Sequence, residues 1–433
     1  MTTTEPAFLA AGRSWEAGLA ASSRKRLGQW LTPWWLVQSA LSEALPGLPA
    51  RPTVLDPSCG DARWLVAAGR HLPGARLVGW DVDPGALRAA HAVCRAAGVD
   101  VELVQRDALF GPTIDADLVV GNPPYVRPQH LPAAHRAAVW GAFATATDKC
   151  DLYAPFVERM LQLAPRICVV VSDTWLCMAS FQALRDHLAQ HPVDLLARVT
   201  DAAFEARVGT VLLSVRPEGR WRRGLVAPSG LHESGEVQRV DGVFAMEDAV
   251  ALHGVGTLAD HWRLRMGVVC GDYARWVRAR AGHPDDRRTC RGKDVRRFAI
   301  ESREWLRYQP RAMLDAKPYV APKHAGLFDV PEKLVLCGAS GATLRAAVDT
   351  ERLFPLDSCY VSEGPGDPWA LCGLLNASSV NAWYGARFPN TRVKAIELAR
   401  LPWPAGGLAR VAAAARAADQ EGVDREVVAA YGL

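Results

Sequence analysis

Apolar segments of strand length alternate with helical patterns over the first half of the chain. Short apolar runs bounded by polar turns are typical of buried strands, and longer stretches with helical spacing separate them. A strand followed by a helix, repeated several times, predicts a mostly parallel sheet with helices on both faces. Strands are expected at residues 53–55, 76–80, 101–104, 116–120 and 167–171, and helices at 61–71, 84–97 and 152–163.

The same alternation predicts how this half of the chain ends. Two further apolar runs, residues 195–199 and 211–215, indicate a hairpin that closes the sheet. A polar loop is expected over residues 127–149, where no strand pattern is present. Residues 217–243 are rich in Gly, Arg and Ser without a clear period, which is typical of a boundary or a connecting hairpin.

The remaining sequence has a different character. It mixes short strands, turns and clusters of Trp and Arg without the strand–helix rhythm. A chain of 433 residues fits about two domains of the usual size. We therefore expect one α/β domain over residues 1–245 and a second domain over residues 246–433.

Composition favours a cytoplasmic protein with no membrane partner. Apolar residues make up 49% of the chain and the mean hydropathy is −0.01. No apolar run reaches the roughly 18 residues that span a bilayer, and the start lacks the charged and apolar regions of a signal peptide. The ten cysteines form no C-x-x-C pair, so neither a metal site nor a disulfide framework is expected. Most of these cysteines should be small buried residues.

Positive charge is concentrated in one segment of the second half. The net charge of the chain is only +4, yet residues 275–311 hold twelve basic residues against five acidic ones. Such a segment beside a neutral half indicates a surface that binds a polyanion. A solvated arginine-rich surface is the alternative interpretation.

Two polar motifs follow apolar strands of the first half. Asp56-Pro57-Ser58-Cys59-Gly60 comes after the first strand, and Asn122-Pro123-Pro124-Tyr125 comes after the fourth. Open α/β sheets bind ligands at the carboxyl ends of their strands, where both motifs lie. The Asn122 amide oxygen and the Pro123 carbonyl can hold both protons of a planar amino group, and Tyr125 offers a ring for stacking. The motifs predict a methyl donor beside an aromatic amine.

Acidic residues follow two more strands. Asp81 ends the second strand, where a carboxylate can bind the ribose hydroxyls of an adenosine-containing cofactor, and Asp107 follows the third as a partner for the adenine amino group. An acid after a strand is commonly only a helix cap. Three acids at successive strand ends, followed by the Asn122 motif, favour a cofactor site.

Together these motifs resemble those of the amino-methylating, S-adenosylmethionine-dependent DNA methyltransferases of the gamma arrangement, and in particular the TaqI-like and Eco57I-like adenine-N6 enzymes. The resemblance covers most of the chain. It implies a Rossmann-like methyltransferase domain with a mostly parallel seven-stranded sheet, followed by a mixed α+β target-recognition domain. It also implies roles for individual residues. The catalytic set is Asn122, Pro123, Pro124, Tyr125 and Phe204, the cofactor set is Thr32, Asp56, Pro57, Ser58, Cys59, Gly60, Asp81, Asp107, Ala108 and Phe156, and the DNA-binding set is Arg291, Lys293, Arg296 and Arg297.

One position departs from the family pattern. The cofactor loop of such enzymes usually carries a glycine two residues after Gly60, and this chain has Ala62 there. If the position needs a positive φ, alanine costs about 1 kcal/mol relative to glycine.

The resemblance implies a site-specific enzyme that methylates N6 of an adenine flipped out of duplex DNA, with S-adenosylmethionine as cofactor. A restriction-modification or related defence system is the expected setting, with duplex DNA and a separately encoded endonuclease or defence subunits as partners, and the chain is expected to be a monomer. Methylation of adenine or guanine in RNA stays open, because basic charge does not distinguish the two polymers. Methylation of a protein glutamine amide and a catalytically silent DNA-binding subunit are further alternatives.

Overall fold

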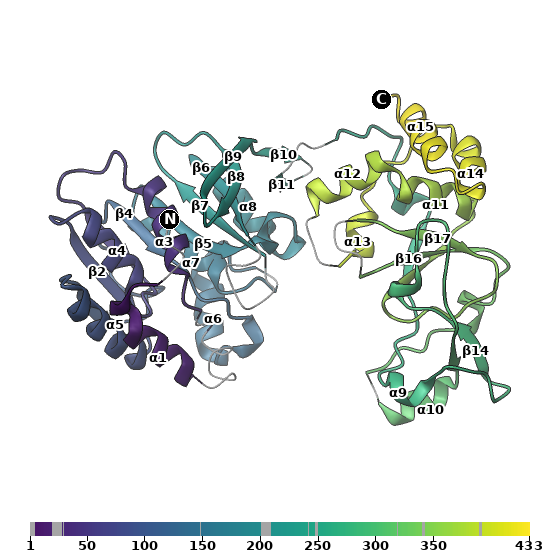
Figure 1. Cartoon of the computed structure of the whole chain (residues 1–433), viewed down its shortest axis with the longest axis horizontal. Helices are drawn as coiled ribbons and strands as arrows, with labels where there is room; N and C mark the ends of the chain where they lie inside the picture. Colours follow the sequence, from purple (N-terminus) through teal and green to yellow (C-terminus); the bar gives the residue numbers. More distant parts are fainter. Residues whose placement is uncertain are drawn as a thin grey trace. The chain divides into compact units, whose positions relative to one another are not determined.

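The computed structural model of the chain describes residues 5–19, 28, 30–147, 149–200, 209–240, 242–246, 250–317, 319–339, 343–388 and 392–433. It divides into two compact units, Met1–Glu247 and Asp248–Leu433 (Figure 1). The boundary predicted from the sequence lies between residues 245 and 246.

The first unit contains a nine-stranded sheet in the order β3-β2-β1-β4-β5-β7-β6-β8-β9. Strands β1 to β5 run parallel, and β7 lies antiparallel between β5 and β6. The chain order reverses between β1 and β4, which is the position where such sheets bind ligands. The strands are β1 (Thr53–Asp56), β2 (Arg76–Asp81), β3 (Glu102–Gln105), β4 (Leu118–Gly121), β5 (Ile167–Ser172), β6 (Val193–Val199), β7 (Thr210–Val215), β8 (Arg222–Ala227) and β9 (Gly230–Glu236).

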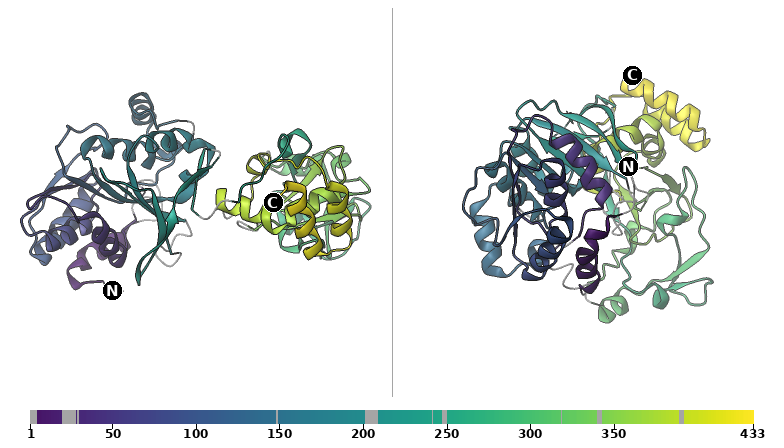
Figure 2. Two further views of the ribbon diagram at one scale, coloured as in Figure 1. Left: turned by 90° about the horizontal axis from the view of Figure 1, so that it is seen from above. Right: turned by 60° about the vertical axis from the view of Figure 1, so that its left-hand side comes forward.

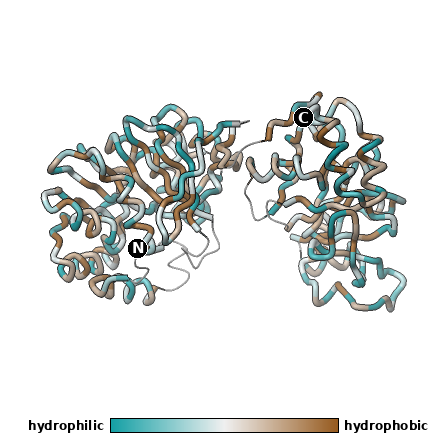
Figure 3. Tube along the Cα trace, turned by 45° about the horizontal axis from the view of Figure 1, so that its top comes forward, coloured by the Kyte–Doolittle hydropathy of each residue, from teal (hydrophilic) through white to brown (hydrophobic). Residues whose placement is uncertain are grey.

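Helices cover both faces of this sheet, because successive strand residues point to opposite sides. Val54 packs with the helices of one face and Leu55 with those of the other. Figure 2 shows these two helical layers, and Figure 3 shows apolar sequence concentrated along the strands. Within the described residues, no helix is both long and apolar enough to cross a membrane. One layer contains α3 (Trp34–Ala44), α4 (Arg63–His71) and α5 (Pro84–Ala97), and the other contains α6 (Ala133–Ala142), α7 (Tyr153–Leu163) and α8 (Gln182–Leu188).

The sheet has two strands more than the seven expected. The segment expected to be a boundary or a connecting hairpin forms β8 and β9, and β8 pairs parallel to β6. Strand β9 is exposed along most of its length, so no apolar alternation marks it in the sequence. The hairpin of β6 and β7 therefore extends the sheet without closing it.

The prediction of a polar loop over residues 127–149 was also wrong in part. Residues Ala133–Ala142 form helix α6. Its sequence is rich in alanine, which has the highest helix propensity, but only Val139 is buried. With one buried position, the segment lacks the apolar periodicity from which a helix would be predicted.

The second unit is mixed α+β. It contains a four-stranded antiparallel sheet in the order β12-β18-β16-β17 and a three-stranded sheet in the order β13-β15-β14. Phe328, Phe354 and Leu306 are among the side chains that fill its core. The strands are β12 (Arg263–Met266), β13 (Val277–Arg278), β14 (Asp286–Thr289), β15 (Glu304–Arg307), β16 (Lys333–Cys337), β17 (Ala346–Asp349) and β18 (Cys359–Glu363), and the helices are α9 (Tyr273–Trp276), α10 (Pro310–Ala316), α11 (Pro368–Asn376), α12 (Ser378–Arg387), α13 (Ala395–Leu398), α14 (Leu408–Arg416) and α15 (Gln420–Tyr431).

All ten cysteines are buried as free thiols, as expected for small residues that fill cores. Four of them, Cys270, Cys290, Cys337 and Cys359, lie in the core of the second unit. Among the described residues, no cluster of His, Cys, Asp and Glu has the arrangement of a metal site.

Candidate active site

A cleft opens at the carboxyl ends of β1, β2 and β4 in the first unit. It encloses about 720 Å³ including its open mouth. Most of the predicted cofactor residues line it, together with part of the predicted catalytic motif. The predicted residues in its wall are Thr32, Asp56, Pro57, Ser58, Cys59, Gly60, Asp81, Ala108, Asn122, Pro124 and Phe156.

Hydrogen bonds fix the loop between β1 and α4 against the end of β2. The Cys59 N–H donates to the Trp80 carbonyl at 2.9 Å, and the Gly60 N–H donates to Asp81 Oδ2 at 2.9 Å. The Ser58 N–H donates to Asp56 Oδ1 at 3.1 Å. The loop and the Asp81 carboxylate thus form one rigid wall of the cleft.

Ala62 has the positive φ at which family members carry glycine. Its φ is 63° and its ψ is 17°, and it stands immediately before α4. An alanine in this left-handed region costs about 1–2 kcal/mol relative to the right-handed one. The loop therefore holds an alanine in a left-handed conformation at the expense of local backbone strain.

Three acidic side chains, Asp56, Asp61 and Asp81, and two basic ones, Arg63 and Arg106, line the cleft. Burial raises the pKa of Asp81 to about 6, an effect that backbone N–H donors from Asp83 and Gly60 partly oppose. Burial also raises the pKa of Asp56 well above its usual range, and the nearby Asp81 and Asp61 carboxylates add to this effect. Both shifts reflect the cost of burying a carboxylate, which a cationic ligand would offset.

The third predicted acid does not line the cleft. Asp107 Oδ1 accepts the Leu109 N–H at 3.0 Å, and Asp107 Oδ2 lies 3.6 Å from Nδ1 of His135 on α6. Its neighbours Arg106 and Ala108 face the cleft in its place. Asp107 therefore has two partners of its own within the protein.

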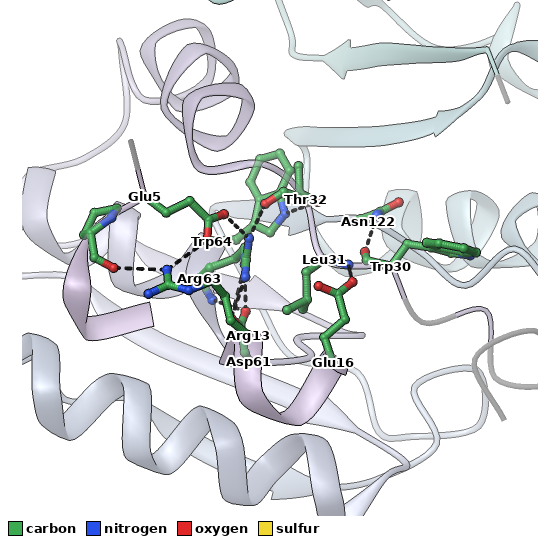
Figure 4. Close-up of polar contacts among 11 residues, drawn as sticks. Glu5, Arg13, Glu16, Trp30, Leu31, Thr32, Asp61, Arg63, Trp64 and Asn122 are labelled. Carbon is green, nitrogen blue, oxygen red and sulfur yellow. Dashed lines mark hydrogen bonds and ion pairs between the residues drawn. The ribbon is translucent and has the colours of Figure 1, made fainter. Parts of the chain in front are cut away.

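Asn122 is held through its amide nitrogen and leaves its oxygen available. Asn122 Nδ2 donates to the Trp30 carbonyl at 2.9 Å (Figure 4). Asn122 Oδ1 is buried and has no hydrogen-bond partner among the described residues. A buried acceptor without a partner costs about 1–3 kcal/mol, so it marks a place where a ligand donor fits.

Tyr125 is anchored beside the cleft. Its hydroxyl donates to the Val170 carbonyl at 3.1 Å, and its ring packs edge-on against Tyr153 with 5.7 Å between centroids. Burial raises the pKa of Tyr125 strongly, so its hydroxyl is protonated at neutral pH. Pro123 is buried next to Asn122, and Phe204 lies outside the described residues.

Comparisons with known proteins identify this unit. Residues 105–197 match the Eco57I restriction-modification methylase family, and residues 54–142 match a methyltransferase-domain family. A Type II methyltransferase of Thermus thermophilus is 30% identical over 210 residues, which are 46% of this chain and 47% of that protein. The chain contains an Eco57I-like methylase domain. We use the name methylase domain for the first unit, which includes both matched ranges.

Two further likenesses extend beyond the methylase domain. The Type II methyltransferase M.XamI of Xanthomonas campestris pv. amaranthicola is 27% identical over 283 residues, which are 58% of this chain and 53% of that protein. The Type IIL restriction-modification enzyme MmeI, solved in complex with DNA, has a similar fold with a TM-score of 0.67 and 13% identity, over 98% of this chain and 78% of that one. The chain spans about half the length of the Thermus and Xanthomonas methyltransferases.

An ion-pair network in the wall of the methylase-domain cleft was not predicted from the sequence. Arg63, buried on α4, binds Asp61 at 2.9 Å and Glu5 at 2.9 Å, and it donates to the Thr32 carbonyl at 2.6 Å (Figure 4). The network ties the N-terminal residues to the cofactor loop. The signal in the sequence was a basic residue, Arg63, beside the apolar residues of α4. A basic residue at the end of a helix is ordinary, so it did not indicate a buried ion pair.

The four predicted DNA-binding residues lie in the second unit, and three of them contact acidic side chains there. Arg291 Nε lies 2.7 Å from Glu304, and its guanidinium lies 4.7 Å from the centre of the Tyr273 ring. Lys293 lies 3.9 Å from Glu304 and Arg296 lies 3.7 Å from Glu301. Arg297 is exposed. Part of the positive charge counted in the sequence is therefore balanced locally.

Proposed function

We propose that this chain transfers a methyl group from S-adenosylmethionine to N6 of an adenine flipped out of duplex DNA. The methylase domain would carry the chemistry and the second unit would recognise the target site. The proposed setting is a restriction-modification or related defence system.

The unpartnered Asn122 Oδ1 carries this proposal. An amino group conjugated to a ring is a poor nucleophile, and its protons are too weakly acidic for a side-chain base. Asn122 Oδ1 and the Pro123 carbonyl can each accept one N–H and leave the nitrogen lone pair directed at the methyl donor. Orientation and electrostatics of this kind supply the rate enhancement without a general base.

The charges of the cleft support S-adenosylmethionine as the cofactor. The cofactor carries a sulfonium and an ammonium group against one carboxylate, and the cleft offers Asp56 and Asp81 to a cation. Asp81 is the proposed acceptor for the ribose hydroxyls, and its position in the cleft wall at the end of β2 supports this role. Val82, which is 52% exposed, and Phe156 offer apolar contacts for the adenine ring. When bound, the cofactor supplies an electrophilic methyl group.

The residues of the chain then act by holding the amine. The Trp30 carbonyl pairs with Nδ2 and so keeps the Asn122 amide turned with Oδ1 away from that carbonyl and unpaired. In the proposed transfer the N–C bond would form as the S–C bond of the bound cofactor broke, and one amine proton would then leave to solvent. Extruding the adenine costs a few kcal/mol, which stacking on an aromatic side chain partly offsets. Tyr125 and Phe204 are the proposed stacking residues.

The test uses the Asn122→Ala variant of the full chain. Because Asn122 is proposed to hold the amine and not the cofactor, the variant should lose at least about a hundredfold in the single-turnover rate of methyl transfer. Its affinity for S-adenosylmethionine, measured by calorimetry, should stay within about twofold of wild type. Circular dichroism and thermal melting check that the variant is folded.

A variant that keeps more than about a tenth of the wild-type rate has lost under ~1.4 kcal/mol of transition-state stabilisation and would exclude this role for Asn122. Loss of cofactor affinity with an unchanged rate at saturation would place Asn122 in the cofactor site.

A further inference from the structure

One peptide group lies between helix α1 (Ala10–Gly18) and Asn122. The carbonyl of the Trp30–Leu31 peptide accepts the Asn122 Nδ2 hydrogen at 2.9 Å. The N–H of the same peptide donates to Glu16 Oε1 at 3.1 Å. Since a peptide group is planar, Glu16 and Asn122 are joined through one rigid unit, which Figure 4 shows between them.

We propose that Glu16 is a positioning residue that sets the orientation of the Asn122 amide through the Trp30–Leu31 peptide. The inference rests on the proposed function, because it concerns how the amine-binding oxygen is presented. It adds a residue outside the cleft to those on which methyl transfer depends.

Orientation matters because the two ends of an asparagine amide differ in chemistry. The oxygen only accepts hydrogen bonds and the nitrogen only donates them. A carbonyl facing the amide selects the orientation in which the nitrogen points toward it, since the flipped amide would set oxygen against oxygen. The Trp30 carbonyl therefore directs Asn122 Oδ1 away from itself and leaves it free to accept.

Selection of this kind requires that the peptide itself be fixed. Glu16 fixes its N–H end with a charged acceptor, and such hydrogen bonds are about twice as strong as neutral ones. Charge at one end of a hydrogen-bonded chain also polarises the next bond, so the Trp30 carbonyl becomes a better acceptor. Removing the Glu16 carboxylate should therefore loosen the peptide and make the Trp30 carbonyl a weaker acceptor.

The backbone just before Trp30 packs closely against the loop that carries Asn122. Gly28 has a φ of 64°, and a Cβ there would lie 2.6 Å from the Tyr125 backbone nitrogen. Gly28, two residues before Trp30, thus lies against the loop that carries Asn122. A change in how α1 holds the peptide is transmitted to the catalytic loop directly.

Glu16 is not among the residues that line the cleft, whereas its neighbour Trp15 is. Its oxygen is directed at a backbone N–H. This separates a positioning role from a contact with the cofactor, and it means that the rate and the cofactor affinity should respond differently to substitution.

The test compares four full-length variants. Glu16→Leu removes the acceptor, Glu16→Gln keeps an acceptor oxygen at the same reach, and Glu16→Asp keeps the charge but is one methylene shorter. Arg13→Leu is the matched control, because Arg13 lies one turn earlier on α1, pairs with Glu5 and is half exposed. Single-turnover methyl transfer and calorimetric affinity for S-adenosylmethionine are measured for each.

A second readout follows the Asn122 amide itself without any methyl transfer. The chain has four asparagines, Asn122, Asn376, Asn381 and Asn390. Labelling asparagine side chains with ¹⁵N therefore gives few NH₂ signals, and Asn122→Ala identifies the one of interest. Glu16→Leu and Glu16→Asp should shift or broaden that signal, Glu16→Gln should shift it less than Glu16→Leu, and Arg13→Leu should leave it near its wild-type position.

We expect Glu16→Leu to lower the single-turnover rate by about tenfold or more, with cofactor affinity within about twofold of wild type and with rescue to within about threefold in Glu16→Gln. An unchanged rate and an unchanged Asn122 signal in Glu16→Leu would overturn the proposal, as would a loss confined to cofactor affinity. If Glu16→Leu does not fold, Glu16→Asp replaces it. A lower rate and a larger shift of the Asn122 signal in Glu16→Asp than in Glu16→Gln would support the proposal, and equal values at the wild-type level would overturn it. Should wild type methylate no adenine while the Asn122 signal still depends on Glu16, the proposed function fails and the positioning role stands.

Discussion

At the scale of single residues, the cleft contains side chains that can be predicted from the sequence and backbone groups that cannot. Asp56, Asp81 and Asn122 stand at the ends of apolar strands, so their meeting at one edge of the sheet follows from parallel topology. The Trp30 carbonyl is a backbone atom, and every residue carries one. Only the fold shows that this particular carbonyl faces the Asn122 amide.

The raised pKa of Asp81 predicts that cofactor binding depends on pH. Its folded pKa of about 6 means that it is largely protonated at about pH 5 and ionised at about pH 7. If the ionised carboxylate accepts the ribose hydroxyls, binding favours the ionised form and releases a proton. Calorimetry should then show affinity for S-adenosylmethionine rising about tenfold from pH 5 to pH 7 and levelling above it.

Asp81→Asn is the control for this pH dependence, because the amide cannot ionise. It should bind more weakly at neutral pH, and the rise between about pH 5 and pH 7 should disappear. An affinity of the wild-type protein that is flat or falls over this range would mean that the ribose is held elsewhere.

At the scale of elements, strands were predicted well and polar surface elements poorly. The expected helix over residues 84–97 coincides with α5, and the expected strands at the cleft lie within one or two residues of β1, β2 and β4. Buried apolar runs specify such elements. Helix α6 and strand β9 expose most of their residues, so their sequences carry little periodicity.

Gly12 of helix α1 lies against Asp61 of the cofactor loop. A Cβ at Gly12 would lie 2.0 Å from Asp61 Oδ2, and Arg63 holds Asp61 in a buried ion pair. Since neither partner can withdraw, Gly12→Ala should destabilise the protein by about 2 kcal/mol or more. Urea unfolding of the full chain measures the change.

Gly18→Ala provides the matched control on the same helix. No atom lies within 4 Å of a Cβ at Gly18, so alanine should be neutral there or should stabilise the helix by up to about 1 kcal/mol. Equal stabilities for the two variants would show that α1 does not pack against the Asp61–Arg63 pair as described.

At the scale of the whole molecule, the basic segment at residues 275–311 lies in the second unit, and the cleft that contains Asn122 lies in the first. If the second unit binds a phosphate backbone, replacing Arg296 and Arg297 by alanine should weaken binding to all duplexes about equally. The slope of log affinity against log salt should fall by about 1–2 units, at roughly 0.9 for each lost phosphate contact. Fluorescence anisotropy over a salt series measures both quantities.

Two arginines on the C-terminal helices serve as controls for this charge effect. Arg410 and Arg425 are exposed and lie near Glu426, outside the basic segment. Their replacement by alanine should leave the salt slope unchanged. An unaltered slope in the Arg296 and Arg297 variant would instead identify the basic segment as a solvated surface.

The central claim concerns the group that receives the methyl. The purified chain is incubated with labelled S-adenosylmethionine and, separately, with duplex DNA, total RNA or protein, and the products are hydrolysed and separated. Since Asn122 Oδ1 and the Pro123 carbonyl are proposed to hold an exocyclic amine, the label should be recovered as N6-methyladenine from duplex DNA and should be absent after Asn122→Ala. Label found on cytosine, in RNA or on a glutamine side chain, with none on DNA adenine, would contradict the account.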